Sequence, residues 1–284
     1  MLGHKLVQAF HSDFETWATL RGRTREYERF GLFDADRTIE GIDVNSFDAL
    51  TAAVERVRPD AIINCVGVIK QLAQARDPIP SLTINSLLPH RLQKLALAAG
   101  ARLIHFSTDC VFAGTKGMYT EAEPSDAQDL YGRTKFLGET SGPGALTIRS
   151  SIIGRELQSA SGLVEWFLGN RGGRVKGFRS AVYTGFTTAV MAGIGRSVLL
   201  KHPDLQGTMQ VSSDPIDKYA LLLLIREAFG VEIQVEADDS VVVDRSLDSS
   251  LFREKTGFAP PSWREMIEEM AKDPTPYDQW RKKQ

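Results

Sequence analysis

Short apolar runs alternate with helical patterns along the first half of the chain. The apolar runs at 16–20, 61–67, 102–106 and 145–149 predict strands. Between them, apolar residues recur at helical spacing in 47–57, 84–99 and 130–140. Strands and helices that alternate at short intervals are typical of a parallel sheet with helices on both faces. We therefore predict an α/β, Rossmann-like doubly wound parallel sheet over residues 1–150, an NAD(P)-binding domain.

The pattern loosens after residue 150. Helices are predicted at 163–168, 188–200, 216–229 and 263–272, with short strands at 208–211 and 233–235. The stretch 170–179 is rich in Gly and Arg and predicts a loop. We interpret residues 151–284 as a smaller C-terminal lobe that binds the substrate and is interleaved with the first domain.

Composition and charge narrow the class of protein. The chain has 284 residues, of which 42% are hydrophobic, and a formal net charge of -2. This balance gives no support for nucleic-acid binding, and no apolar run is long enough to span a membrane. The first residues lack the apolar stretch of a signal peptide, so we expect a soluble, cytoplasmic protein with reduced cysteines. The five histidines are scattered without ligand spacing, and we expect no metal site.

Candidate chemistry follows the run at 102–106. Thr108 and Asp109 come directly after this buried strand, and Tyr131 and Lys135 stand four residues apart on a predicted helix, hence on one face. An ammonium beside a phenol favours the phenolate, which makes the Tyr a proton donor and acceptor near neutral pH. Together these groups can protonate a carbonyl oxygen while a cofactor delivers hydride. The competing interpretation is a solvent-facing helix with a stacked Tyr and Lys.

Two further segments point to a dinucleotide. The segment from Asn64 to Gly67 ends the preceding strand, where ligands bind in doubly wound sheets. Arg21 and Arg23 follow the first strand, a position where Arg suits the 2′-phosphate of NADP; NADPH is favoured and NADH stays open. Asp43 with Val44 is interpreted either as a strand end over the adenine or as a turn.

At these residues the chain resembles the extended short-chain dehydrogenase/reductases, and within them the dTDP-4-dehydrorhamnose reductase group. The matching segments are 107–109 with 111–114, 131–135 with 138–139, 64–67, 84–85, 148–150, 247–249 and 256–258. Cys110 stands where that group usually has a Tyr. The resemblance covers essentially the whole chain.

The resemblance implies an enzyme that reduces the 4-keto group of a nucleotide-activated 6-deoxy sugar, with NADPH, in surface polysaccharide synthesis. Tyr131 would be the general acid, Lys135 would lower its pKa, and Thr108 would bind the carbonyl, with Ser107 as the weaker candidate. Asp109 and Ile152 would contact the sugar. The residues implied at the cofactor are Gly3, Arg21, Asp43, Val44, Cys65, Val66, Gly67, Phe106, Tyr131 and Lys135. A homodimer is left open.

The start of the chain departs from the family pattern. The family begins with a strand and a glycine-rich turn that holds the pyrophosphate, and here only Met1 to Gly3 fits the end of that motif. We expect the first strand, central in the sheet, and the start of the turn to be missing. Two alternatives stay open: an epimerase or dehydratase of the same superfamily, and a non-catalytic NADP-binding regulatory subunit. Asp109 is not followed by a Glu, which favours reduction over dehydration.

Overall fold

The computed structural model describes residues 1–71 and 73–281. Its main sheet has four parallel strands in the order β10-β5-β4-β3. The strands are β3 (Ala61–Asn64), β4 (Arg102–Ser107), β5 (Ala145–Arg149) and β10 (Gly207–Gln210). Asn64 lies opposite His105, and Ser107 opposite Arg149, so the carboxyl ends of three strands meet at one edge. The α/β fold with a parallel sheet is confirmed.

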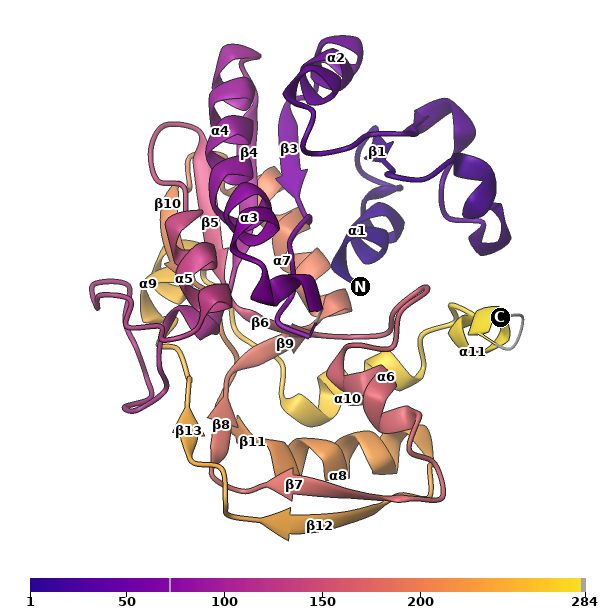
Figure 1. The fold of residues 1–284 in the computed structure, drawn as a ribbon, viewed down its shortest axis with the longest axis vertical. Coiled ribbons are helices and arrows are strands. Elements are labelled where there is room, and N and C mark those ends of the chain that lie inside the picture. The colour runs from indigo at the N-terminus through magenta and orange to yellow at the C-terminus, as the bar shows by residue number, and fades with distance from the viewer. Residues whose placement is uncertain (72, 282–284) are drawn as a thin grey trace.

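Two apolar cores cover the two faces of this sheet, because successive strand residues point to opposite sides. Leu103 and Ala145 pack against α2 (Phe47–Val57) and α4 (Leu88–Ala98). Ile104 and Ile148 face α1 (Leu2–Phe10) and α7 (Thr188–Lys201). Figure 1 shows α4 and α7 on opposite sides of the sheet. The prediction of helices on both faces is confirmed.

A separate pair of short parallel strands lies beside the main sheet, β1 (Ala18–Thr19) with β2 (Thr38–Ile39). Three 3-10 helices surround it: η1 (Thr24–Glu26), η2 (Glu28–Phe30) and η3 (Ala35–Arg37). Figure 1 shows β1 on the side of β3 that faces away from β4. In the described part of the chain no strand pairs with that edge of β3. The expectation of a missing first strand stays a prediction.

Further short elements and helices follow the strands β3 and β4. After β3 come η4 (Ala73–Arg76), α3 (Pro78–Ser81) and a π-helical turn, η5 (Leu82–Leu87), which runs into α4. After β4 come η6 (Asp109–Val111) and α5 (Leu130–Leu137).

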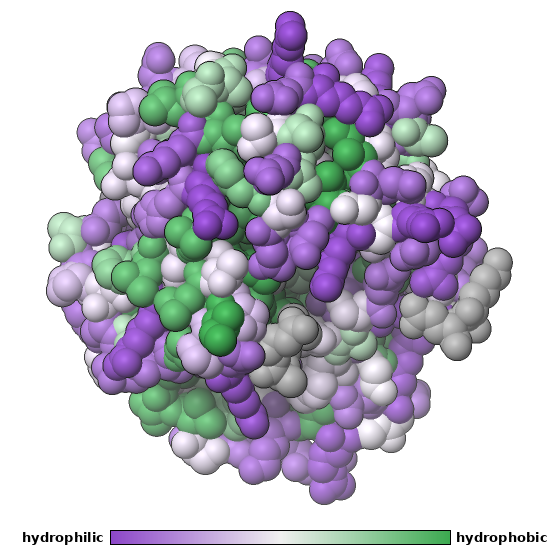
Figure 2. All heavy atoms as spheres, turned by 45° about the horizontal axis from the view of Figure 1, so that its top comes forward, coloured by the Kyte–Doolittle hydropathy of each residue, from purple (hydrophilic) through white to green (hydrophobic). Residues whose placement is uncertain are grey.

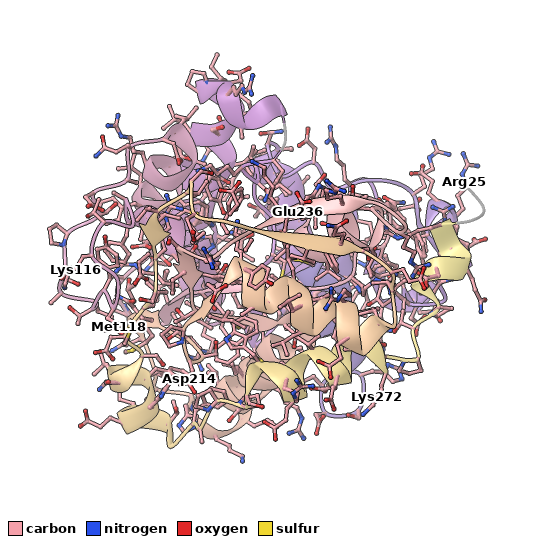
Figure 3. All side chains as sticks on the ribbon, turned by 90° about the horizontal axis from the view of Figure 1, so that it is seen from below. Arg25, Lys116, Met118, Asp214, Glu236 and Lys272 are labelled. Atoms are coloured by element: carbon pink, nitrogen blue, oxygen red, sulfur yellow. The ribbon has the colours of Figure 1, made fainter. Side chains whose placement is uncertain are left out.

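The second half builds smaller sheets below the main one. Its strands pair as β11-β8-β13, β12-β7 and β6-β9. They are β6 (Ser151–Ile153), β7 (Arg174–Phe178), β8 (Ala181–Tyr183), β9 (Gly185–Thr187), β11 (Ile216–Asp217), β12 (Gln234–Asp238) and β13 (Val243–Asp244). The helices are α6 (Leu163–Leu168), α8 (Lys218–Phe229), α9 (Ser250–Thr256), α10 (Trp263–Ala271) and α11 (Tyr277–Arg281). Figure 3 shows β12, which carries Glu236, lying across α8.

Two elements of the second half of the chain pack directly against the first half. β10 is an edge strand of the main sheet, and α7 packs on α1. The predicted loop at 170–179 is wrong in part, because β7 forms there by pairing with β12 along its whole length. The division into domains at residue 150 stays a prediction.

Helix α5 approaches its neighbours so closely that two of its glycines cannot carry a side chain. A Cβ at Gly132 would overlap the carbonyl oxygen of Cys110, and a Cβ at Gly138 would overlap that of Asn85. Both obstacles are backbone atoms, which move only with their own elements. The docking of α5 therefore depends on these two glycines.

Gly138→Ala is expected to destabilise the protein by about 1–3 kcal/mol, because α5 must move away from η5. Gly193→Ala is the matched control, since a Cβ there meets no atom within 4 Å and alanine favours a helix. Urea unfolding of the two variants measures the difference. Equal stability of both variants would contradict this packing.

The C-terminal helix α11 ties the end of the chain to its beginning. The buried His4 Nε2 lies 2.7 Å from the hydroxyl of Tyr277, and Lys5 pairs with Asp273 at 2.5 Å. Burial, with smaller effects of the N-terminal amine and Lys5, lowers the pKa of His4 to about 3. His4 is therefore neutral in the folded protein at neutral pH.

This buried histidine makes the fold sensitive to acid. Below pH 6.5 the unfolded chain binds a proton at His4 that the folded chain does not, until pH falls to about 3. Stability is expected to fall across that range by roughly 1.4 kcal/mol per pH unit from this group alone. His4→Gln should flatten the decline in thermal unfolding experiments, and His11→Gln, at an exposed site, should leave it unchanged. An unchanged decline in His4→Gln would refute the assignment.

One face of the molecule exposes large apolar side chains, which Figure 2 shows as green areas. The exposed residues on α3, η5, α4 and α5 are Ile79, Leu82, Leu87, Leu97, Phe136 and Leu137. The homodimer stays a prediction. No helix among residues 1–71 and 73–281 is long and apolar enough to cross a membrane.

Candidate active site

Thr108 and Asp109 stand where β4 ends, as the sequence predicts. Thr108 caps η6: its Oγ1 accepts a hydrogen bond from the amide of Cys110 at 3.1 Å and donates to Asp109 Oδ1 at 2.9 Å. Both side chains are buried. Burial raises the pKa of Asp109 against the opposing effect of the Thr108 hydrogen bond and of Arg245. The strand end thus presents a hydroxyl next to a buried carboxyl group.

Tyr131 reaches this hydroxyl from α5. The helix begins at Asp129, whose Oδ1 accepts the amide hydrogen of Gly132 at 2.8 Å. Burial, followed by the Cys110 thiol, raises the pKa of Tyr131, and the nearby Thr108 hydroxyl offsets only part of this rise. Tyr131 is therefore a protonated phenol at neutral pH.

Lys135 lies one turn further along α5, with its amine buried. Its Nζ donates to the carbonyl oxygen of Phe106 at 2.6 Å and lies 3.3 Å from His105 Nε2. Burial lowers the pKa of Lys135 to about 8, with Glu139 acting in the opposite direction. The expected lowering of the Tyr131 pKa by an ammonium is not what the structure shows, because burial outweighs other effects at Tyr131.

Sequence reasoning did not assign a role to Glu139, which connects three elements. Its carboxylate accepts from Arg149 Nε at 2.8 Å and Nη2 at 2.7 Å, and also from Ser107 Oγ at 2.7 Å. The pair is buried, with exposed side-chain fractions of 5% and 6%. Ser107 thus donates its hydroxyl hydrogen to Glu139, as Thr108 donates its own to Asp109. Glu139 follows α5 and Arg149 ends β5, and nothing in the sequence alone indicates that the two side chains pair.

Two asparagines hold the loop after β3. Asn64 Oδ1 accepts from Val66 N at 3.0 Å, and Asn85 Oδ1 accepts from Val68 N at 2.8 Å. Cys65, Val66 and Gly67 were predicted to line a cofactor. All three residues lie in this loop and are exposed. Gly3 of α1 lies against this loop, since a Cβ there would sit 3.6 Å from Cys65 Cβ. The helix start and the loop thus border one surface.

The other predicted cofactor residues lie beyond β3, next to the β1–β2 pair. Arg21 and Arg23 are exposed directly after β1. Asp43 is exposed and accepts from the amide and side chain of Asn45, at 3.0 and 2.8 Å. This bond, and to a smaller degree Arg21, lowers the pKa of Asp43. Asp43 thus forms a turn, and the half-buried Val44 follows it.

Two candidate residues of the second half of the chain, Ile152 and Tyr183, lie on the strands β6 and β8. Ile152 lies on β6, partly exposed, two residues after Ser150. Tyr183 on β8 is buried, and its hydroxyl has no hydrogen-bond partner among the described residues. Burial, then the Asp109 carboxylate, raises the pKa of Tyr183, so these two side chains are close enough to interact. The outer loop that follows η6 carries Lys116 and Met118, seen at the edge of Figure 3.

The structure therefore brings Phe106, Thr108, Asp109, Tyr131 and Lys135 together, with 65–67 at the neighbouring strand end. Arg21 and Asp43 lie further along the same edge. In the described ranges no three His, Cys, Asp or Glu side chains are placed to hold a metal ion.

A parallel Rossmann-like sheet with a Thr, a Tyr and a Lys at its carboxyl edge places the chain in the class of extended short-chain dehydrogenase/reductases. More narrowly, residues 1–154 match the RmlD substrate binding domain, and the chain belongs to this family.

Relatives and solved structures agree with that assignment. A dTDP-4-dehydrorhamnose reductase of Streptomyces griseus is 32% identical over 99 residues, which are 34% of this chain and 33% of that protein. The methionine adenosyltransferase 2 subunit beta of Rattus norvegicus is 26% identical over 217 residues, 71% of this chain and 64% of that protein. The structure of dTDP-4-dehydrorhamnose reductase from Bacillus anthracis in complex with NADP aligns with a TM-score of 0.72 at 16% identity, over 90% of this chain and 99% of that chain.

The chain thus spans about a third of the length of the curated reductase that it matches, and less than two thirds of the length of the methionine adenosyltransferase subunit. The solved structure, at 16% identity, supports the fold.

Proposed function

We propose that the chain reduces the 4-keto group of a nucleotide-activated 6-deoxy sugar with NADPH, in nucleotide-sugar biosynthesis. The observation that carries the proposal is the placement of Thr108 at the end of β4 next to α5, which carries Tyr131 and, one turn further, the Lys135 amine that donates to Phe106. The relatives named as dTDP-4-dehydrorhamnose reductases support this choice of substrate class.

The two hydroxyl groups suit the protonation of a ketone as it is reduced. Thr108 would turn its hydroxyl hydrogen from Asp109 to the carbonyl oxygen and so fix the position of that oxygen. Tyr131, a neutral phenol because its pKa is raised, gives its proton to the oxygen as negative charge develops there. Asp109 and Tyr183 then provide an acceptor and a hydroxyl for the sugar from either side.

The residues present fit a dinucleotide along the edge of the sheet. The exposed 65–67 loop, anchored by Asn64 and Asn85, would pass under it, and Gly3 leaves room for a close backbone approach. Lys135 would hold the nicotinamide ribose, and Phe106 would line the same side. Asp43 and Val44 would flank the adenine. When bound, the nicotinamide supplies the hydride.

Tyr131→Phe is expected to lower turnover by a factor of about 100 to 10,000, because the proton donor is lost while the ring and its packing stay. Tyr219→Phe, on α8, removes a phenol outside the site and should leave turnover unchanged. Steady-state rates of NADPH oxidation with a dTDP-4-keto-6-deoxy sugar measure both. Full activity of Tyr131→Phe would exclude Tyr131 as the acid.

The preference for NADPH is proposed from the exposed Arg21 and Arg23. The double change Arg21→Ala with Arg23→Ala is expected to raise the KM for NADPH about tenfold, and that for NADH hardly at all, because NADH lacks the 2′-phosphate. Arg226→Ala, at an exposed position on α8, is the charge-matched control. Equal effects on both cofactors would contradict a 2′-phosphate contact.

One assay separates the proposal from its alternatives. The chain is incubated with NADPH and a panel of nucleotide-linked keto sugars, and products are identified by mass spectrometry. Reduction adds two hydrogens, epimerisation leaves the mass unchanged, and dehydration removes water. A chain that binds NADPH but converts no sugar would point to the binding-subunit alternative, which the similarity to the methionine adenosyltransferase subunit raises.

A further inference from the structure

The short C-terminal helix α11 contacts three segments that border the proposed cofactor site. Its side chains meet the start of α1 at His4, the segment 20–37 that follows β1, and the loop 154–162 between β6 and α6. Two of these segments carry residues proposed to bind the cofactor, Gly3 on α1 and Arg21 after β1. Figure 1 shows α11 at the outer edge of the molecule, below the indigo segment that follows β1. One helix therefore touches parts of the site that are far apart in the sequence.

The segment 20–37 rests on α11 through one buried side chain. From residue 11 to residue 37, Phe30 is the single buried residue, with an exposed fraction of 3%. It forms an aromatic cluster with Tyr277 and Trp280, and its ring meets that of Trp280 edge to face, with 4.9 Å between the ring centroids. An isolated two-stranded pair such as β1–β2 is marginally stable at best, so the place of this segment depends on the aromatic cluster.

The loop 154–162 is joined to the same helix by Arg281. Its Nη2 donates to the carbonyl oxygen of Glu156 at 2.8 Å and to that of Ser159 at 2.9 Å. Leu157, in the middle of this loop, packs against the aromatic cluster. The loop follows directly on β6, so α11 holds the segment that comes after the proposed sugar contact on that strand.

A group of paired charges fixes α11 itself. The Arg155 guanidinium lies 5.0 Å from the centroid of the Tyr277 ring and pairs with Glu165 at 2.7 Å and with Asp278 at 2.5 Å. Arg155 and Glu165 are buried, and a buried pair is costly to break because one charge would lose its partner. The Tyr277 hydroxyl lies 2.7 Å from His4 Nε2. Both halves of the chain thus hold α11 in one position.

We propose that α11 is a clamp for the adenosine end of the cofactor site, with Trp280 and Tyr277 as positioning residues. Trp280 holds Phe30, and through it the segment that carries Arg21 and Arg23, at a fixed place beside the main sheet. A site that is held in its binding conformation loses less conformational entropy when the ligand binds. The clamp acts through the segments that it holds and not through a contact of its own. The inference rests on the proposed function for the identity of the cofactor.

The reacting end of the site is held by other contacts. Tyr131 and Lys135 lie on α5, which packs against η5 and η6. Because the aromatic cluster is separate from these elements, loosening α11 should disturb the adenosine end and leave the reacting end in place.

Hydrogen exchange of the full chain measures the clamp without cofactor or substrate. Trp280→Ala is expected to raise the exchange rates of the amides in 20–37 about tenfold, while β4 and β5 keep their wild-type rates. Trp280→Phe keeps an aromatic ring and should restore slow exchange. Trp166→Ala, at an exposed site on α6, is the matched control. Equal exchange of 20–37 in Trp280→Ala and the wild type would overturn the inference.

Two fragments of NADPH show which end of the site the clamp serves. Trp280→Ala is expected to weaken the binding of 2′,5′-ADP about tenfold, because the two arginines are no longer held in place. The binding of reduced nicotinamide mononucleotide should stay unchanged. Isothermal titration calorimetry measures both. A general loss of structure would weaken both fragments equally, and that result, like unchanged binding of 2′,5′-ADP, would refute the clamp.

Phe30→Leu tests the same contact from its other side and replaces Trp280→Ala if that variant does not fold. It keeps an apolar side chain but loses the ring, so the same pattern is expected with a smaller size. In the reaction, either variant should raise the KM for NADPH and change kcat by less than about a factor of two. If exchange and 2′,5′-ADP binding behave as expected while no keto sugar is reduced, the proposed function fails and the clamp stands.

Discussion

The hydrogen bond of 2.6 Å between the Lys135 amine and the carbonyl oxygen of Phe106 is the contact on which the candidate site depends. A buried amine is costly unless its hydrogens are paired, and this bond provides the pairing at the very end of β4. Gly132 and Gly138 let α5 lie close to η6 and η5, and the Asp129 cap starts the helix just before Tyr131.

The parallel register of the main sheet brings the rest of the site to the same edge. Since Asn64 lies opposite His105 and Ser107 opposite Arg149, the side chains that follow β3, β4 and β5 meet without any long loop. The Glu139–Arg149 pair then fixes the end of α5 to β5. The β1–β2 pair, with Arg21 near it, is a separate sheet, so the proposed adenosine side is tied to the main sheet less directly than the candidate site at the end of β4.

The sequence predicts the fold because the fold depends on local patterns. Apolar runs that alternate with helical patterns are sufficient for the parallel sheet, and a spacing of four residues from Tyr131 to Lys135 is sufficient for a shared helix face. The roles of these two residues stay predictions. His105 was not assigned because a polar residue inside a buried strand has meaning only once its partner across the sheet is known. The strand β7 was missed for a related reason: it forms by pairing with β12, sixty residues later. The direction of the Tyr131 pKa depends on burial, which no spacing in the sequence reveals.

The most direct measurement is hydride transfer itself. The chain is given NADPH carrying deuterium at the transferable C4 position, with a dTDP-4-keto-6-deoxy sugar, and the product is examined by NMR. Deuterium at C4 of the sugar, lost when Tyr131 is changed to Phe, is the expected result. A chain that binds NADPH yet leaves the deuterium on the cofactor with every keto sugar offered would contradict the proposed reductase.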